Sequence, residues 1–201
     1  ECEEVEVPVN DECDGAIEVF SGAATDFTNV NATDSAPSVP ISCSTSNGPD
    51  MKNDVWFRYI ASCTGTTRFS LCGATDFDDR MVIYRGSDCP NEASAVGGCS
   101  DDFCGINSSV SIFTIEGFPY LIRVGSPDGS SGTGMLMVDC DPVAEPCPAD
   151  LDGDGEVSGA DLGLLLASFG GSGPGDLNDD GLVDGGDLGL LLAEFGPCST
   201  P

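Results

Sequence analysis

The chain has 201 residues and is strongly acidic, with 35 Asp and Glu against six Lys and Arg and a formal net charge of −29. Such a surface repels nucleic acids and anionic membranes and attracts cations. The absence of histidine excludes histidine-based acid–base catalysis, Ser–His triads and ordinary zinc catalysis. We therefore expect a non-enzymatic protein that neither binds nucleic acid nor inserts into a membrane.

The first ten residues show a strand pattern, because Val5, Val7 and Val9 alternate with polar residues and proline. Two interpretations remain open for this extension. It pairs with a sheet of its own domain, or it adds a strand to the sheet of a neighbouring molecule.

Residues 11–140 are predicted to form a mainly β domain, a β-sandwich of the jelly-roll type, because short β-branched and aromatic runs alternate with Gly, Asp, Ser and Pro. Trp56 is expected in its core. The strands are expected at Val55–Ile60, Thr67–Leu71, Met81–Tyr84, Val110–Ile115, Tyr120–Val124 and Met135–Val138.

Several short motifs of this domain resemble β-sandwich modules of secreted bacterial proteins, the pre-peptidase C-terminal and CUB-like domains. That resemblance implies binding or assembly rather than catalysis. The motifs are Asn10–Cys13, Asp54–Tyr59, Ser70–Gly73, Asp76–Asp78, Ile83–Gly86 and Tyr120–Gly125.

One group of acidic residues in the domain has two interpretations: a third calcium site, or an acidic loop pair that Arg80 and Arg85 screen. The group comprises Asp76, Asp78, Asp79, Asp101 and Asp102. Asn31 and Asn107 begin glycosylation sequons, which matter only in a host that glycosylates them.

Eleven cysteines predict disulfides and therefore an oxidising compartment. The longest apolar run is too short to span a membrane, and no export signal is visible, so we expect a mature secreted protein, extracellular or at the cell surface. The odd count leaves one cysteine free or bonded to another chain, and Cys2 is the candidate. The connectivity does not follow from the sequence, but the candidate pairs are Cys63 with Cys72 and Cys13 with Cys43, and one bond is expected among Cys89, Cys99 and Cys104.

Residues 141–146 contain two prolines and are predicted to be a stiff linker. Beyond it, residues 147–201 contain a repeat at a 26-residue offset, and all six basic residues of the chain precede residue 124. Each copy begins with an acidic, Gly-containing loop and continues into a Leu-rich segment of helical spacing that a glycine ends. The acids of this region therefore have no cationic side chain nearby in sequence and are expected to rely on metal ions.

Each loop matches the calcium loop of EF-hands, with ligands at positions 1, 3, 5, 7, 9 and 12 and Gly at position 6. Alternate residues of a tight turn point inward, and oxygen ligands suit the hard Ca²⁺ ion. Val157 and Val183 at position 8 are expected to pair the two loops. The predicted ligands are Asp150, Asp152, Asp154, Glu156, Ser158 and Asp161 in the first loop, and Asp176, Asn178, Asp180, Leu182, Asp184 and Asp187 in the second.

This segment resembles a dockerin, a small α module with two calcium ions, whose position 12 is Asp instead of the Glu of ordinary EF-hands. Dockerins bind cohesin domains. Positions 10 and 11 here are Gly159-Ala160 and Gly185-Gly186, unlike the Ser-Thr of the cellulosomal type, which argues against a cellulosomal cohesin. Cys147 and Cys198 bracket the repeat and are predicted to form a disulfide that holds its ends together.

Helical geometry separates two sets of apolar residues in the Leu-rich segments. Leu164 and Leu190 lie off the expected core stripe and are predicted to contact a partner, unless the sandwich covers them. The core stripe is expected to comprise Leu162, Leu165, Leu166 and Phe169, and likewise Leu188, Leu191, Leu192 and Phe195.

Two functions from different classes follow. In the first, the chain is a secreted, calcium-binding structural protein that docks on another copy of itself or on a cohesin-like domain and builds a filament or surface layer. In the second, the sandwich is a carbohydrate-binding or adhesive subunit for a surface glycan, and the dockerin-like module anchors it to a cohesin-type scaffold.

Overall fold

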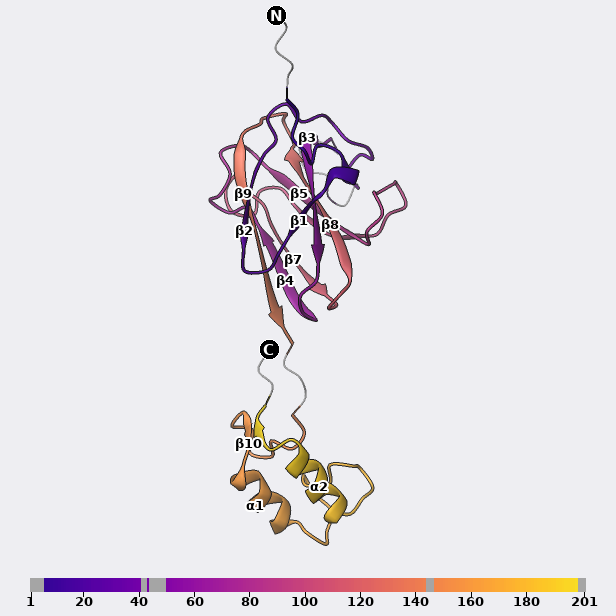
Figure 1. Ribbon diagram of the computed structural model, residues 1–201, viewed down its shortest axis with the longest axis vertical. Coiled ribbons are helices and arrows are strands. Elements are labelled where there is room, and N and C mark those ends of the chain that lie inside the picture. The colour runs from indigo at the N-terminus through magenta and orange to yellow at the C-terminus, as the bar shows by residue number, and fades with distance from the viewer. Residues whose placement is uncertain (1–5, 41–42, 44–49, 144–146, 199–201) are drawn as a thin grey trace, which may run out of the picture. The chain divides into compact units, whose positions relative to one another are not determined.

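The computed structural model describes residues 6–40, 43, 50–143 and 147–198 and contains two compact units, Glu1–Pro142 and Val143–Pro201 (Figure 1). We call them the β unit and the C-terminal unit. The protein is mainly β, as the sequence predicts. Across the described residues, every helix is too short or too polar to cross a membrane.

The β unit contains a five-stranded sheet and a four-stranded sheet. In the first, the strand order is β1 (Ile17–Val19), β3 (Lys52–Ile60), β8 (Pro119–Ser126), β5 (Arg80–Arg85) and β6 (Val96–Ser100). In the second, it is β2 (Ala24–Thr28), β9 (Thr133–Pro142), β4 (Gly65–Ser70) and β7 (Ser109–Thr114). All six strands expected from the sequence are present, and β1, β2 and β6 are additional.

One apolar core contains side chains of both sheets, so the two sheets pack against each other. Val55, Phe57 and Tyr59 of β3 lie in this core, whereas Trp56 between them belongs to a second buried cluster with Tyr84 and others. Both faces of β3 are therefore buried. The prediction that Trp56 is a core residue is confirmed, since its exposed fraction is 0%.

The chain before β3 covers the outer face of the five-stranded sheet through buried polar contacts. The Nδ2 of Asn10 donates to the carbonyl of Trp56 at 3.0 Å, and the amide of Trp56 donates to the carbonyl of Asn10 at 2.8 Å. Arg123 forms a buried ion pair with Asp54 at 2.9 Å and also donates to the carbonyl of Ser35. This covering layer includes the 3-10 helix η1 (Cys13–Gly15).

The N-terminal extension forms no strand within its described part, residues 6–10. Val7 and Val9 are 50% and 82% exposed, so the interpretation that they pair within their own sheets is wrong. Besides the bonds of Asn10 to Trp56, Asn31 donates from its Nδ2 to the carbonyl of Glu6 at 3.2 Å. Val5 lies outside the described residues.

Four disulfides join segments of the β unit that lie far apart in sequence, and they correct the expected pairings. Cys63 and Cys72 lie beyond opposite ends of β4, and a six-residue strand separates its ends by roughly 20 Å, so these two cysteines do not meet. The observed bonds are Cys13–Cys89, Cys43–Cys99, Cys63–Cys140 and Cys72–Cys104.

A fifth disulfide, Cys147–Cys198, confirms the predicted link between the ends of the repeat. Five disulfides indicate an oxidising, extracellular environment. Cys2, the candidate for the odd cysteine, lies outside the described residues.

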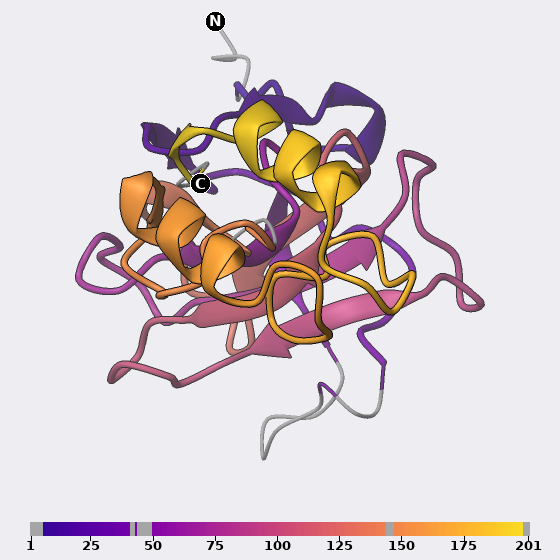
Figure 2. The same cartoon turned by 90° about the horizontal axis from the view of Figure 1, so that it is seen from below.

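The C-terminal unit contains α1 (Gly159–Ala167) and α2 (Gly185–Ala193), which lie side by side (Figure 2), and the short strands β10 (Glu156–Val157) and β11 (Gly196–Pro197). Strand β9 extends to Pro142, so the linker predicted for residues 141–146 begins two residues later. Residues 144–146 of that linker lie outside the described part.

Candidate metal centre

The first acidic loop brings three carboxylates to one place. Oxygens of Asp150, Asp152 and Asp154 all lie within 4.8 Å of one another. Backbone amides fix the first of them: Asp150 Oδ1 accepts from Gly153 N at 2.8 Å and Asp154 N at 3.1 Å, and its Oδ2 accepts from Gly155 N at 2.9 Å. The loop is therefore closed around the carboxylate at position 1.

Left-handed backbone at two positions lets the loop turn this tightly. Gly155, at position 6, has φ 90°, and Gly181 at the same position of the second loop has φ 93°. Position 4 is also left-handed, with φ 76° at Gly153 and φ 57° at Asp179. Glycine adopts this region without steric cost, which explains its presence at position 6 of both loops.

The carboxylate at position 12 lies in the first turn of the helix and closes the far side of the loop. Asp161 Oδ1 accepts from the amides of Leu151 and Asp152 at 2.8 and 3.1 Å, and its Oδ2 accepts from Ser158 N at 2.7 Å. Ser158 in turn caps the helix by accepting from the amide of Ala160. The amide of Ser158 is the main cause that lowers the pKa of Asp161, and this favours the ionised carboxylate.

The second loop repeats this geometry. Asp176 accepts from Asp180 N at 3.1 Å and from Gly181 N at 2.8 Å, as Asp150 does in the first copy. Asp187 accepts from the amides of Leu177, Asn178 and Asp184, as Asp161 does.

The remaining predicted ligands also hold equivalent places in the two loops. At position 7, the amides of Glu156 and Leu182 each donate at 3.0 Å to the carboxylate at position 5, Asp154 and Asp180 respectively. At position 9, Ser158 and Asp184 cap α1 and α2. The predicted ligands are thus gathered into two like-built loops.

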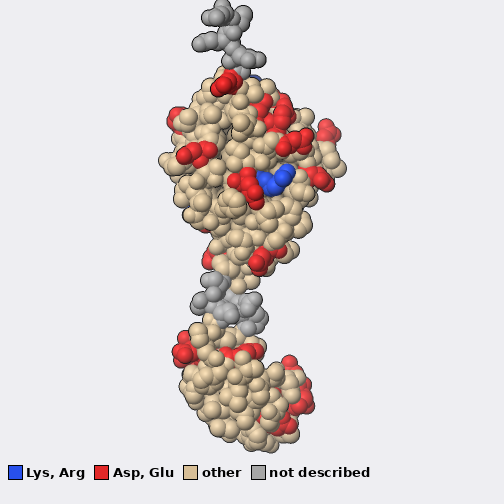
Figure 3. Space-filling model, in the orientation of Figure 1, with Lys and Arg blue, Asp and Glu red and all other residues tan. Residues whose placement is uncertain are grey.

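This donor set fits a hard divalent cation. The side-chain donors are oxygens of Asp, Asn and Ser, and position 7, Glu156 or Leu182, offers its backbone carbonyl. The C-terminal unit has no Lys or Arg, and acidic side chains are prominent on the surface of the unit that Figure 3 shows. Burial first, and then the charges of Asp154, Asp161 and Asp150, raise the pKa of Asp152. A bound cation would remove this mutual repulsion.

The backbone of each loop bonds to the residues that follow the helix of the other copy. Val157 pairs with Gly196, which follows α2, and the amide and carbonyl of Val183 bond to Gly171 and Gly170, which follow α1. The expectation that Val157 and Val183 pair the loops directly is therefore wrong. Both valines are fully buried in a core with Ala149, Leu165 and Leu191.

The core of the C-terminal unit is narrower than the helical spacing suggests. Leu165 and Leu191 are buried and Leu162 and Leu188 partly buried, as expected, but the remaining expected core residues are exposed. Each helix has nine residues, and the phenylalanines follow the helices' ends, where the helical periodicity no longer directs them inward. The exposed fractions are 52% for Leu166, 50% for Phe169, 53% for Leu192 and 54% for Phe195.

Leu164 and Leu190, the predicted partner contacts, are exposed at 46% and 42% within their own unit. With the four residues above they form a set of six exposed apolar side chains, three from each copy of the repeat. We call this set the apolar surface.

The acidic residues of the β unit are not gathered as a metal site would require. Asp101 pairs with Arg80 at 3.1 Å, as the screening interpretation expects, and Asp76 accepts from the amide of Thr133. Among the described residues, the acidic side chains that converge are Asp150, Asp152 and Asp154. Asp78, Asp101 and Asp102 lie near one another, since burial and then the charges of Asp102 and Asp101 raise the pKa of Asp78, but among the described residues they do not converge as the ligands of a third calcium site would.

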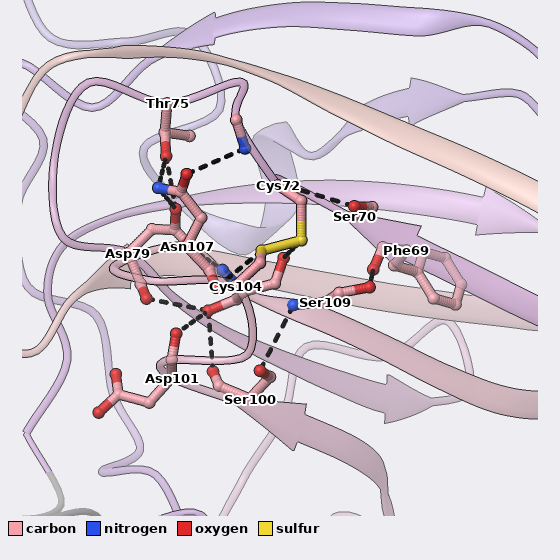
Figure 4. The surroundings of a disulfide bond; sticks show 12 residues. Phe69, Ser70, Cys72, Thr75, Asp79, Ser100, Asp101, Cys104, Asn107 and Ser109 are labelled. Carbon is pink, nitrogen blue, oxygen red and sulfur yellow. Dashed lines mark hydrogen bonds between the residues drawn. A yellow bond between two sulfur atoms is a disulfide. The ribbon is translucent and has the colours of Figure 1, made fainter.

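Asp79 instead lies in a buried hydrogen-bond network beside the Cys72–Cys104 disulfide (Figure 4). It accepts from Asn107 Nδ2 at 3.0 Å and from the amide of Ser108 at 2.8 Å. Burial, which outweighs these bonds, raises the pKa of Asp79 to about 6.

Asn107, which begins one of the two sequons, is 6% exposed, and its amide group is bonded inside this network. The folded β unit therefore does not present Asn107 for glycosylation, whereas Asn31 of the other sequon is exposed.

No family model matches this chain, and no curated protein matches it.

Proposed function

We propose that the chain is a secreted, calcium-binding structural protein, in which a jelly-roll-like β-sandwich is the building block and a dockerin-like module with two Ca²⁺ ions is the docking part. The observation that carries the proposal is the convergence of Asp150, Asp152 and Asp154, which Asp161 closes, together with the same pattern of amide-to-carboxylate bonds in the second loop. Two loops of the same construction in one small unit indicate a selected site more than a chance accumulation of acids.

Calcium serves folding in this proposal. Within its described residues, the C-terminal unit has a core of five buried apolar residues, and each loop concentrates negative charge at the start of a helix. A small core of this kind needs a disulfide or a metal to be stable. Ca²⁺ supplies the cation that the module's own sequence lacks.

The apolar surface supports a docking role. Leu164, Leu166 and Phe169 in the first copy correspond to Leu190, Leu192 and Phe195 in the second, and all six are at least 42% exposed. Apolar side chains that are exposed together mark a protein contact, and in this proposal a partner covers residues of this set. The partner is a second copy of the chain or a cohesin-like domain, and the absence of cations in the unit favours a partner surface that is apolar or basic.

Calorimetric titration with Ca²⁺ tests the metal site, and the second loop offers a matched pair of variants. Asp176→Asn removes the charge at position 1, whereas Asp179→Asn removes the same charge from a neighbouring residue outside the ligand set and suits its left-handed backbone. We expect two calcium sites in the wild type and in Asp179→Asn, and one in Asp176→Asn. Equal binding by both variants would contradict the assignment of the loop.

Light scattering and electron microscopy of the intact protein, with Ca²⁺ and with EGTA, test the docking role. Calcium-dependent assemblies that EGTA dissolves identify a second copy as the partner. A monomer in both conditions that binds a cohesin-like domain only in Ca²⁺ identifies the alternative partner. Particle size and partner binding that both ignore calcium would refute calcium-dependent docking.

A further inference from the structure

Both cysteines of the Cys147–Cys198 disulfide bond to the first acidic loop through their backbone. The carbonyl of Cys147 accepts from the amide of Asp150, at position 1, over 3.0 Å. The amide of Cys198 donates to the carbonyl of Gly155, at position 6, over 2.9 Å. The disulfide therefore joins the two chain segments that hold this loop, one at its first predicted ligand and the other at its turn.

The disulfide also lies beside the carboxylate at position 1. The Sγ of Cys198 is 3.7 Å from Oδ2 of Asp150, and the same oxygen accepts from the amide of Gly155 at 2.9 Å. One carboxylate oxygen thus contacts both the sulfur bridge and the turn of the loop. Without the bridge, Cys198 is free to move away from Asp150, and its backbone bond to Gly155 is lost with that movement.

The second loop has a different covalent support at the equivalent place. The amide of Asp176, at position 1, donates to the carbonyl of Gly173 at 3.0 Å, which matches the bond made to Cys147 in the first copy. At the 26-residue offset of the repeat, Cys147 corresponds to Gly173 and Cys198 corresponds to Ser172. Ser172 and Gly173 are neighbours in the chain, so a peptide bond joins them. The disulfide therefore has, in the first copy, the place that this peptide bond has in the second.

Removal of the disulfide consequently changes the two loops unequally. The first loop is then held at the chain end by the pairing of the two-residue strands β10 and β11, without a covalent link. In the second loop, the peptide bond between Ser172 and Gly173 remains. Partners that orient metal ligands by hydrogen bonds typically change metal affinity by about 10–100-fold when they are lost. A loss of this kind is expected in the first loop alone.

We propose that the Cys147–Cys198 disulfide positions the first calcium site and sets its affinity relative to that of the second site. The inference rests on the proposed binding of two Ca²⁺ ions by the C-terminal unit. A disulfide also restricts the unfolded chain, but that effect acts on the unit as a whole and changes both sites together. The contacts of the two cysteines with Asp150 and Gly155 add an effect that belongs to the first site.

Amide NMR spectra of the intact, isotope-labelled protein can follow the two loops separately. The amides of Gly155 and Gly181 each donate to the carboxylate at position 1 of their own loop, at 2.9 and 2.8 Å, so each signal reports one site. We would titrate the wild type and Cys147→Ser/Cys198→Ser from EGTA to excess Ca²⁺. The ratio of the Gly155 midpoint to the Gly181 midpoint should rise at least about tenfold in the variant.

Ser172→Ala/Gly173→Ala is the matched control, because it changes the two equivalent positions of the second copy and leaves their peptide bond intact. The new Cβ at position 173 would lie 3.6 Å from Ser168 Cβ, an ordinary contact, and the ratio of midpoints should stay at the wild-type value. Midpoints that move together in the cysteine variant would overturn the inference and leave the calcium module standing. Wild-type signals that do not respond to Ca²⁺ would instead refute the proposed function and this inference with it.

A reciprocal measurement does not require the cysteine variant to fold. If the bond raises the affinity of the first site, calcium in that site protects the bond by the same factor. We would treat Asp150→Asn and Asp176→Asn in excess Ca²⁺ with a dithiol, which is oxidised as the disulfide becomes two thiols. Cys147–Cys198 should be reduced at about a tenfold lower ratio of reduced to oxidised dithiol in Asp150→Asn. Alkylation and mass spectrometry measure the reduced fraction, and equal reduction in the two variants would contradict the inference.

Discussion

Replacing the disulfide Cys147–Cys198 by two serines should raise the calcium concentration that the C-terminal unit needs in order to fold. The bond closes a loop with a sequence separation of 51. In the chain-entropy model such a bond stabilises the folded state by about 4 kcal/mol at 25 °C. Ca²⁺ binding has to replace that stabilisation when the bond is removed.

The size of the shift follows from linkage. Each of two equal sites must supply about 2 kcal/mol more, and a tenfold rise in free Ca²⁺ adds about 1.4 kcal/mol per site once the ion exceeds its Kd. We therefore expect the midpoint of calcium-driven folding to move about 30-fold higher in Cys147→Ser/Cys198→Ser than in the wild type.

The assay can separate the two units within the intact chain. The α-helices of the described residues, α1 and α2, lie in the C-terminal unit, so circular dichroism at 222 nm during a titration from EGTA to excess Ca²⁺ follows that unit. The single tryptophan lies in the β unit, and its emission should stay constant in both proteins. A midpoint shift below about threefold, or a wild type that keeps its helical signal in EGTA, would refute the reasoning.

Three further outcomes are expected. The folded-state pKa of Asp79 is raised from 3.8 to about 6, so the unfolded chain ionises first as pH rises. The β unit should lose about 2 kcal/mol between pH 4 and pH 6.5 that Asp79→Asn does not lose, which urea titrations at several pH values measure. Gly98→Ala should destabilise the β unit by about 1–3 kcal/mol, because the new Cβ would lie 2.7 Å from Val110 Cγ1. Gly97→Ala, in which the closest approach of the new Cβ is 3.3 Å, should destabilise the unit less, and thermal unfolding of the two variants measures the difference. Leu164→Ser/Leu190→Ser should abolish calcium-dependent association at unchanged calcium affinity, and unchanged particle size would contradict the role of the apolar surface.

The geometry of the two acidic loops could be predicted in detail because it is local. Six positions within twelve residues define each loop, and the turn depends on one left-handed glycine, Gly155 or Gly181. The bond between Cys147 and Cys198 could be predicted for a related reason, since the repeat between them brings its own ends together.

The disulfides of the β unit could not be predicted, because they depend on which strands become neighbours. Cys63 is closer in sequence to Cys72 than to Cys140, but β4 carries the chain across the sheet between the first two. Strand β6 was also missed, since two glycines in Val96–Ser100 weaken its strand pattern. Gly98 is explained only by the side chains of Val110 and Ile112 that pack against it.

The exposed leucines of the C-terminal unit show a further limit of periodicity. A helical pattern tells which residues share a stripe, but the width of the stripe that is buried depends on what packs against it. Here two valines from the loops occupy much of that space, and one leucine from each helix completes the core.

The exchange of backbone bonds between the two copies has a consequence for any chain that carries one copy alone. The valine of each loop is paired by the residues that follow the helix of the other copy. In a peptide with a single loop and helix, the backbone of the valine would have no partner, and the residues that follow the helix would have no valine to bond with. Two such peptides would complete each other, so half of the repeat should exist in folded form only as a homodimer.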